Sequence, residues 1–133
     1  MLFLDTSALI KRYVEEEGTA FVLERMEEDQ DWVVSSLAPA EAEITLCRLG
    51  FEPTRDADRS RRLGVDLERC LMVPVDRACL DRGAEIGCRY DLRTLDALHL
   101  AAADRLPRPF TILTFDKRQA DAGRSMGLVV DGA

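Results

Sequence analysis

The segment LFLDTSA, residues 2–8, is a short apolar run that ends in an acidic residue and two hydroxyl residues. Consecutive apolar residues without alternation are typical of a strand that is covered on both faces, as in a parallel sheet. Thr6 and Ser7 stand where either could cap a helix over residues 7–17, SALIKRYVEEE. The segment therefore predicts a strand, a turn that carries Asp5, and a helix, which is the repeating unit of an α/β fold.

The same order, a strand followed by a helix, recurs along the rest of the chain. Further strands are predicted at 32–36, 71–75, 110–116 and 128–130. Helices are predicted over 19–29, 37–50, 54–70, 76–90, 94–106 and 117–127, the first of these with Phe21, Val22, Leu23 and Met26 facing inward. Buried strands that alternate with helices form a parallel sheet with helices on both faces. We expect a three-layer α/β/α sandwich with a mostly parallel five-stranded sheet, formed as a single domain over residues 1–133.

The composition limits the functions that are open to the chain. Hydrophobic residues make up 47% and charged residues 32% of the 133 residues, which fits a globular protein with one core. No apolar run approaches the ~20 residues of a membrane span, and the N-terminal segment lacks the basic region of a signal peptide. We therefore expect a cytoplasmic protein that has no membrane partner.

The net charge of −7 argues against binding nucleic acid through bulk positive charge. It leaves nucleic acid open as a substrate, because a bound divalent cation reverses the local field where a phosphate would lie.

Two acidic residues directly follow predicted strands. Asp5 follows residues 2–4 of the first strand, and Asp116 follows residues 112–115 and ends the fourth. The carboxyl ends of parallel strands meet at one edge of the sheet, where α/β folds bind their ligands. A lone aspartate in such a place is usually a helix cap, whereas two at the same edge predict a site.

Two predicted helices add acids to this edge. Glu41 lies one turn into the helix that follows strand 32–36, and Asp96 lies in the first turn of an otherwise apolar helix. A plain N-cap is a competing explanation for Asp96. Four converging carboxylates raise one another's pKa values unless a cation lies between them. Oxygen ligands favour Mg²⁺ or Mn²⁺ over zinc, and such a site can activate a water for attack on a phosphodiester.

Four segments carry these acids: LDTSALIKRY (4–13), SSLAPAEAEITLCR (35–48), LRTLDALHLAAA (92–103) and ILTFDKRQADAGRSMGL (112–128). In order and spacing they resemble the motifs of PIN-domain nucleases, in particular the VapC-type toxins of toxin–antitoxin pairs. The resemblance implies a five-stranded parallel sheet and a metal-dependent endoribonuclease that uses Mg²⁺, with Mn²⁺ as a substitute. It also implies an RNA substrate, a small cognate antitoxin and a homodimer.

By this resemblance the acidic positions of the family fall on Asp5, Asp96 and Asp116 as metal ligands, and the helical glutamate falls on Glu41. Glu43 is the near alternative, because it lies about 200° further around the helix and both cannot face one site. Thr6 and Ser7 match hydroxyl positions that would support the ligands or orient a water, and Thr114 is expected to do the same from the fourth strand.

Several other residues are weaker candidates. The basic residues near the acids could contact RNA phosphates: Arg89, Arg93, Lys11 and Arg12. His99, the only histidine, lies three residues after Asp96. On so apolar a helix it is expected to be a core residue rather than a metal ligand or general base.

Alternatives from other classes remain. The main one is a catalytically inactive PIN-like domain that acts as a protein or RNA binding module. A haloacid-dehalogenase-type phosphatase also begins from an aspartate after its first strand, but it needs a second aspartate where Ser7 stands. A phosphoacceptor receiver domain needs an acidic pair at this turn, which Asp5 and Thr6 do not supply.

Overall fold

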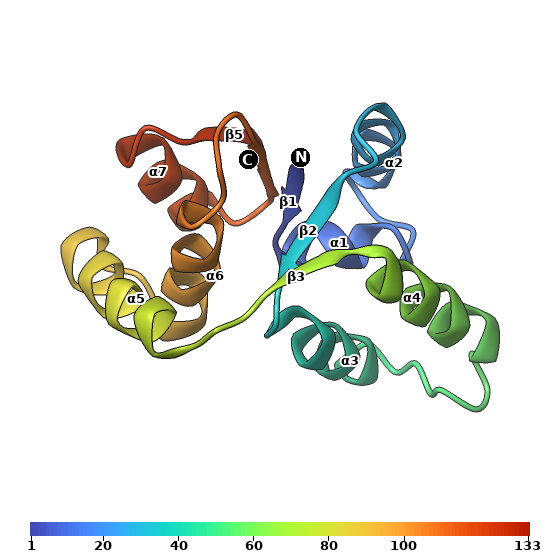
Figure 1. Ribbon diagram of the computed structural model, residues 1–133. Helices are drawn as coiled ribbons and strands as arrows, with labels where there is room; N and C mark the ends of the chain where they lie inside the picture. Colours follow the sequence, from blue (N-terminus) through green and yellow to red (C-terminus); the bar gives the residue numbers. More distant parts are fainter.

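Five short strands alternate with seven helices in the computed structural model, which describes residues 1–133 (Figure 1). The strands are β1 (Leu2–Leu4), β2 (Trp32–Ser35), β3 (Leu71–Val73), β4 (Thr111–Thr114) and β5 (Val129–Gly132). The helices are α1 (Thr6–Lys11), α2 (Thr19–Glu28), α3 (Ala38–Arg48), α4 (Ala57–Arg69), α5 (Arg77–Tyr90), α6 (Thr94–Asp104) and α7 (Lys117–Ser125). None of the helices is long and apolar enough to cross a membrane. Each predicted element is present, most of them slightly shortened at their ends.

All five strands run parallel, in the order β3-β2-β1-β4-β5. The chain runs outward from β1 to β3 and then returns to the other side of β1, so the strand order reverses between β1 and β4. These two strands are hydrogen-bonded neighbours. The residues that follow them therefore lie side by side at the switch point, where α/β folds bind their ligands. The predicted three-layer architecture is confirmed, and the sheet is entirely parallel.

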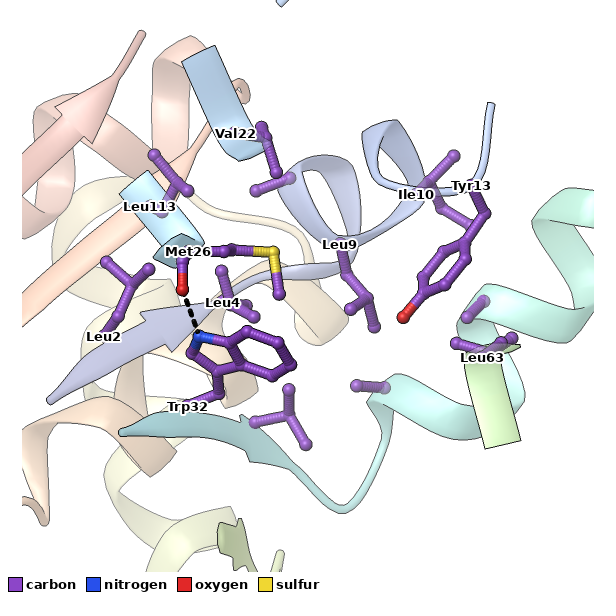
Figure 2. Close-up of a cluster of buried hydrophobic side chains, with 14 of the residues drawn as sticks. Leu2, Leu4, Leu9, Ile10, Tyr13, Val22, Met26, Trp32, Leu63 and Leu113 are labelled. Atoms are coloured by element: carbon purple, nitrogen blue, oxygen red, sulfur yellow. Dashed lines mark hydrogen bonds between the residues drawn. The ribbon is translucent and has the colours of Figure 1, made fainter. Parts of the chain in front are cut away.

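The two faces of the sheet bury separate hydrophobic clusters. Leu2 and Leu4 of β1 contribute to the cluster under α1 to α4, whereas Phe3 contributes to the cluster under α5 to α7. Side chains alternate along a strand, so both faces must be apolar when both are covered. Figure 2 shows the first cluster, in which the indole N–H of Trp32 donates to the carbonyl of Met26 at 3.0 Å. This double coverage explains the unalternating apolar run in β1.

Two details of the first helices differ from the predictions. Phe21 and Leu23 are each 39% exposed, so the prediction that they face inward was wrong, while Val22 and Met26 are buried. Residues one turn apart share one narrow face of α2, and only that face packs on the sheet. The first helix also ends at Lys11 instead of continuing to residue 17.

Directly after α1, the chain is hydrogen-bonded to Asp66 of α4. The Oδ2 atom of Asp66 accepts hydrogen bonds from Nε of Arg12 at 2.8 Å and from the hydroxyl of Tyr13 at 2.6 Å. Partial burial by itself would raise the pKa of Asp66, but these two hydrogen bonds and the charge of Arg12 outweigh it and lower the pKa. Asp66 is therefore held as a charged acceptor.

Replacing Asp66 by asparagine should destabilise the fold by about 1–3 kcal/mol, because hydrogen bonds to charged, partly buried groups are lost or weakened. The folded-state pKa lies below the ordinary value of 3.8. The stabilisation is thus present above that value and is lost as the pH falls through the folded-state pKa. Urea unfolding should show a large difference in the free energy of unfolding between the two proteins at neutral pH and a smaller difference in acid. The exposed Asp58→Asn exchange on the same helix is the control. A difference in the free energy of unfolding that does not change with pH would contradict a charged Asp66 paired with Arg12.

Candidate metal centre

Four acidic residues from different parts of the chain line one cleft at the carboxyl edge of the sheet. Asp5 and Asp116 follow β1 and β4, Asp96 lies in the first turn of α6, and Glu41 lies in the first turn of α3. All four border a cleft of about 410 Å³. The structure thus brings together the four predicted site acids. With the side chains as placed, no three His, Cys, Asp or Glu residues form a ready group of metal ligands.

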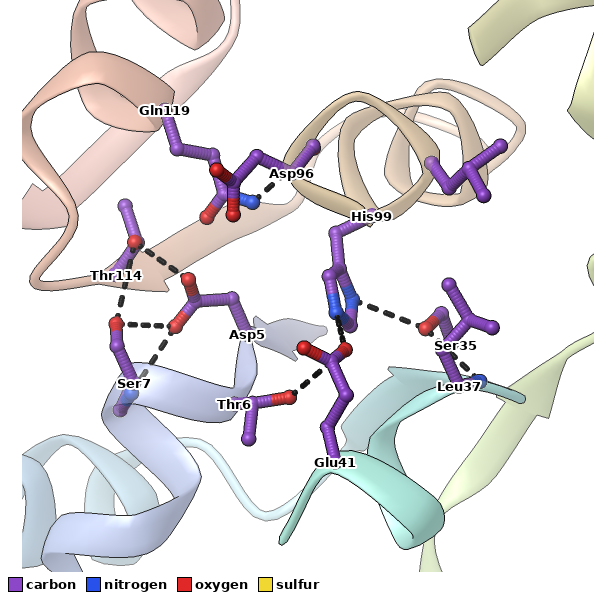
Figure 3. A network of polar contacts seen from close by, with 12 residues as sticks. Asp5, Thr6, Ser7, Ser35, Leu37, Glu41, Asp96, His99, Thr114 and Gln119 are labelled. Atoms are coloured by element: carbon purple, nitrogen blue, oxygen red, sulfur yellow. Dashed lines mark hydrogen bonds and ion pairs between the residues drawn. The ribbon is translucent and has the colours of Figure 1, made fainter. Parts of the chain in front are cut away.

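Asp5 is both buried and closely held. Its Oδ1 accepts hydrogen bonds from the Ser7 hydroxyl at 2.6 Å and from the backbone N–H of Ala8 at 3.0 Å, and its Oδ2 accepts one from the Thr114 hydroxyl at 2.8 Å (Figure 3). Asp5 is therefore itself the N-cap of α1, and the prediction that Thr6 or Ser7 caps this helix was wrong. Burial raises the pKa of Asp5 although these hydrogen bonds favour its charged form.

The three predicted hydroxyl residues each contact a site acid. Ser7 and Thr114 both donate to Asp5, and their oxygens in turn accept the backbone N–H groups of Phe115 and Asp116. These bonds join the turn after β1 to the turn after β4. Thr6 differs, because its hydroxyl donates to Oε1 of Glu41 at 3.4 Å. Their support of a metal site stays a prediction.

Asp96 and Asp116 lie at the rim of the cleft, where Arg93 lies between them. Nε of Arg93 is 3.2 Å from Oδ2 of Asp96, and one of its terminal nitrogens is 3.9 Å from Oδ2 of Asp116. Asp116 also caps α7, since its Oδ1 accepts the N–H of Gln119 at 2.8 Å. The Arg93 side chain is 79% exposed, so little holds it in this place.

Glu41 faces the cleft and meets His99, a contact that the sequence analysis did not predict. The Nε2 atom of His99 is hydrogen-bonded to Oε1 of Glu41, and His99 is only 2% exposed. His99 lies one helical turn after Asp96, a spacing that could have placed it at the same cleft. Glu43 is exposed and borders a separate groove between α3 and α4. Of the two candidate glutamates, only Glu41 lines the cleft that the three aspartates border.

The family model of the PIN domain matches residues 2–125. Ribonuclease VapC46 of Mycobacterium tuberculosis (strain ATCC 25618 / H37Rv) is 35% identical over 130 residues, which cover 97% of this chain and 95% of that protein. The chain is a member of the PIN-domain family of VapC ribonucleases. Ribonuclease VapC47 of Mycobacterium tuberculosis (strain CDC 1551 / Oshkosh) is 31% identical over 134 residues, 97% of this chain and 94% of that protein.

A solved structure shares the fold of this PIN domain. It is described as a toxin-antitoxin complex from Klebsiella pneumoniae, and it superposes with a TM-score of 0.69 at 16% identity, over 90% of this chain and 89% of that one. At this identity the likeness concerns the fold alone.

PIN-domain VapC ribonucleases are generally metal-dependent, and the free oxygens of this cleft fit a divalent cation. Each carboxylate oxygen can accept about two hydrogen bonds. Oδ2 of Asp5 accepts one, and Oδ1 of Asp96 accepts none within the chain. Asp5 is 4% exposed and forms no ion pair with a basic side chain, so a cation would offset the cost of its buried charge. The oxygen-only donor set suits a hard ion such as Mg²⁺.

The four basic residues proposed for phosphate contact are in different positions. Arg93 and Lys11 line the cleft, although Lys11 also binds Glu16. Arg12 is paired with Asp66 of α4, and Arg89 stacks over the ring of Tyr90, so neither side chain borders the cleft. The cleft thus retains two of the four.

Proposed function

We propose that this PIN domain is a Mg²⁺-dependent endoribonuclease in which Mn²⁺ can substitute for Mg²⁺. Asp5, Asp96 and Asp116 are the proposed metal ligands. The observation that carries the proposal is the convergence of these acids and Glu41 on one cleft, at the point where the strand order reverses. The two relatives named as ribonucleases support RNA as the substrate.

A bound divalent cation supplies Lewis-acid activation of the phosphodiester and of an attacking water. Ser7 and Thr114 hold the Asp5 carboxylate in one orientation. Burial would raise the pKa of Glu41, but the hydrogen bonds from His99 and Thr6 lower it. Glu41 is therefore ionised at neutral pH, and we assign it the role of general base. Arg93 can reach a phosphate oxygen from the rim.

We further propose that the chain, as a single domain over residues 1–133, is the toxin of a type II toxin–antitoxin pair. Its partners would be a small cognate antitoxin and a second copy of the chain, and it would meet its RNA in the cytoplasm. The fold shared with the Klebsiella pneumoniae toxin-antitoxin complex supports the antitoxin. Light scattering on the purified chain, alone and with the product of the adjacent gene, tests both partners.

The ribonuclease proposal is tested by removing the metal. The chain is incubated with a mixed RNA pool in Mg²⁺, in Mn²⁺ or in excess chelator, and the new RNA ends are sequenced. We expect cleavage in either metal and none in chelator, because the carboxylates alone do not activate the phosphodiester. An identically prepared Asp5→Asn protein excludes a contaminating nuclease. Equal cutting by both proteins would contradict the proposal, and RNA binding without cutting would favour an inactive binding module.

A further inference from the structure

A buried histidine connects the core of the protein to Glu41. His99 of α6 bonds Glu41 of α3 through Nε2, and its Nδ1 lies 3.0 Å from the hydroxyl oxygen of Ser35 at the end of β2 (Figure 3). His99 and Ser35 are 2% and 0% exposed, respectively. The three residues come from three different elements, so their contact does not follow from the local structure of any one element.

The surroundings of Ser35 determine which ring nitrogen carries the proton. The Ser35 oxygen accepts the backbone N–H of Leu37 at 3.2 Å. The only acceptor within the chain for the Ser35 proton is Nδ1 of His99, at 3.0 Å. A buried hydroxyl that fails to donate costs about 1–3 kcal/mol. Ser35 therefore donates to Nδ1, and the neutral ring carries its proton on Nε2 and donates it to Glu41.

The same contact fixes the direction of the glutamate. The hydrogen bonds from His99 and Thr6 both fall on Oε1 of Glu41, which leaves Oε2 without a partner within the chain. No lysine or arginine forms an ion pair with Glu41. A glutamate has three rotatable bonds, so without the imidazole this side chain would be free to turn into water.

We propose that His99 is a positioning residue for the reaction: oriented by Ser35, it holds Oε2 of Glu41 toward the metal cleft. The inference rests on the proposed ribonuclease function. The proposed role is not that of a metal ligand, since both ring nitrogens of His99 already have partners within the chain. It is not simple core packing either, because it depends on these two polar contacts.

Kinetics of two substitutions separate positioning from packing. His99→Leu keeps apolar bulk but removes the donor, so kcat should fall about 10- to 100-fold, as for other residues that orient a site group, while KM changes little. His99→Gln can place an N–H near the position of Nε2 and should recover much of kcat. Both are assayed well below their unfolding midpoints. In a Glu41→Gln background, His99→Leu should add little further loss. A fully active His99→Leu protein would overturn the proposal.

The ring itself gives a readout that is independent of activity. Because the chain has one histidine, a long-range ¹H–¹⁵N spectrum of the labelled chain reports on His99 alone. We expect a proton on Nε2, the nitrogen that contacts Glu41, and a displaced Nδ1 resonance in Ser35→Ala. A proton on Nδ1 and none on Nε2 would remove the donor to Glu41 and overturn this inference, while it would leave the ribonuclease proposal intact. Absence of cleavage by the wild type would instead overturn the ribonuclease proposal, and with it the role of His99.

Discussion

Replacing Asp5 by asparagine should lower metal-dependent RNA cleavage by at least about 100-fold. A bound metal supplies several kcal/mol of transition-state stabilisation, and each 1.4 kcal/mol corresponds to about a factor of ten in rate. Asp5 is the most buried of the four acids and the one held by three hydrogen bonds. An amide in its place offers one oxygen and no charge, so a bound cation would lose the most rigid of its proposed ligands.

The substitution should leave the fold intact, because the amide oxygen can still accept the N–H of Ala8 and cap α1. Burial raises the pKa of Asp5, so in chelator the charged side chain is a cost that the neutral amide avoids. Thermal unfolding should therefore show two similar proteins without metal, and Mg²⁺ or Mn²⁺ should stabilise only the wild type. The exposed Asp81→Asn exchange on α5 is the matched control. Equal stabilisation of both proteins by metal would show that the ion binds elsewhere.

From the sequence alone, helix capping and metal binding are alternative explanations for an aspartate that follows a strand. The structure shows that one side chain can do the first and remain available for the second. In both Asp5 and Asp116, Oδ1 accepts a backbone N–H of the following helix. The second oxygen points elsewhere, toward Thr114 in one case and Arg93 in the other. A cap at the carboxyl edge of a parallel sheet is therefore no argument against a site.

The strands, the helices and the four acids could be predicted because each rests on a local pattern. Apolar runs mark buried strands, and the carboxyl ends of parallel strands share one edge. The side-chain partners could not be predicted in this way. The contact of His99 with Glu41 joins residues 58 positions apart, and that of Arg12 with Asp66 joins residues 54 apart. Such contacts depend on how α6 and α4 pack, which no local pattern specifies.

The exposure of Phe21 has a similar cause. The four apolar residues predicted inside α2 span more of the helix circumference than the sheet covers, and only Val22 and Met26 face it. The sequence shows which side chains are apolar. How wide a stripe becomes buried depends on the neighbouring elements.

Expression of the wild type in a bacterium without the cognate antitoxin should arrest growth, and Glu41→Gln should relieve the arrest. The glutamine keeps an oxygen that can accept from His99 and Thr6 but cannot act as a base at neutral pH. Glu43→Gln makes the same chemical change on the same helix, at an exposed position about 200° away.

This control variant should remain as toxic as the wild type, since Glu43 borders another groove and not the cleft. Colony counts after induction, with immunoblots to equalise protein levels, measure the difference. Relief by Glu43→Gln but not by Glu41→Gln would contradict Glu41 as the proposed base and indicate Glu43 instead. Equal toxicity of all three proteins would show that growth arrest does not depend on the chemistry of this cleft.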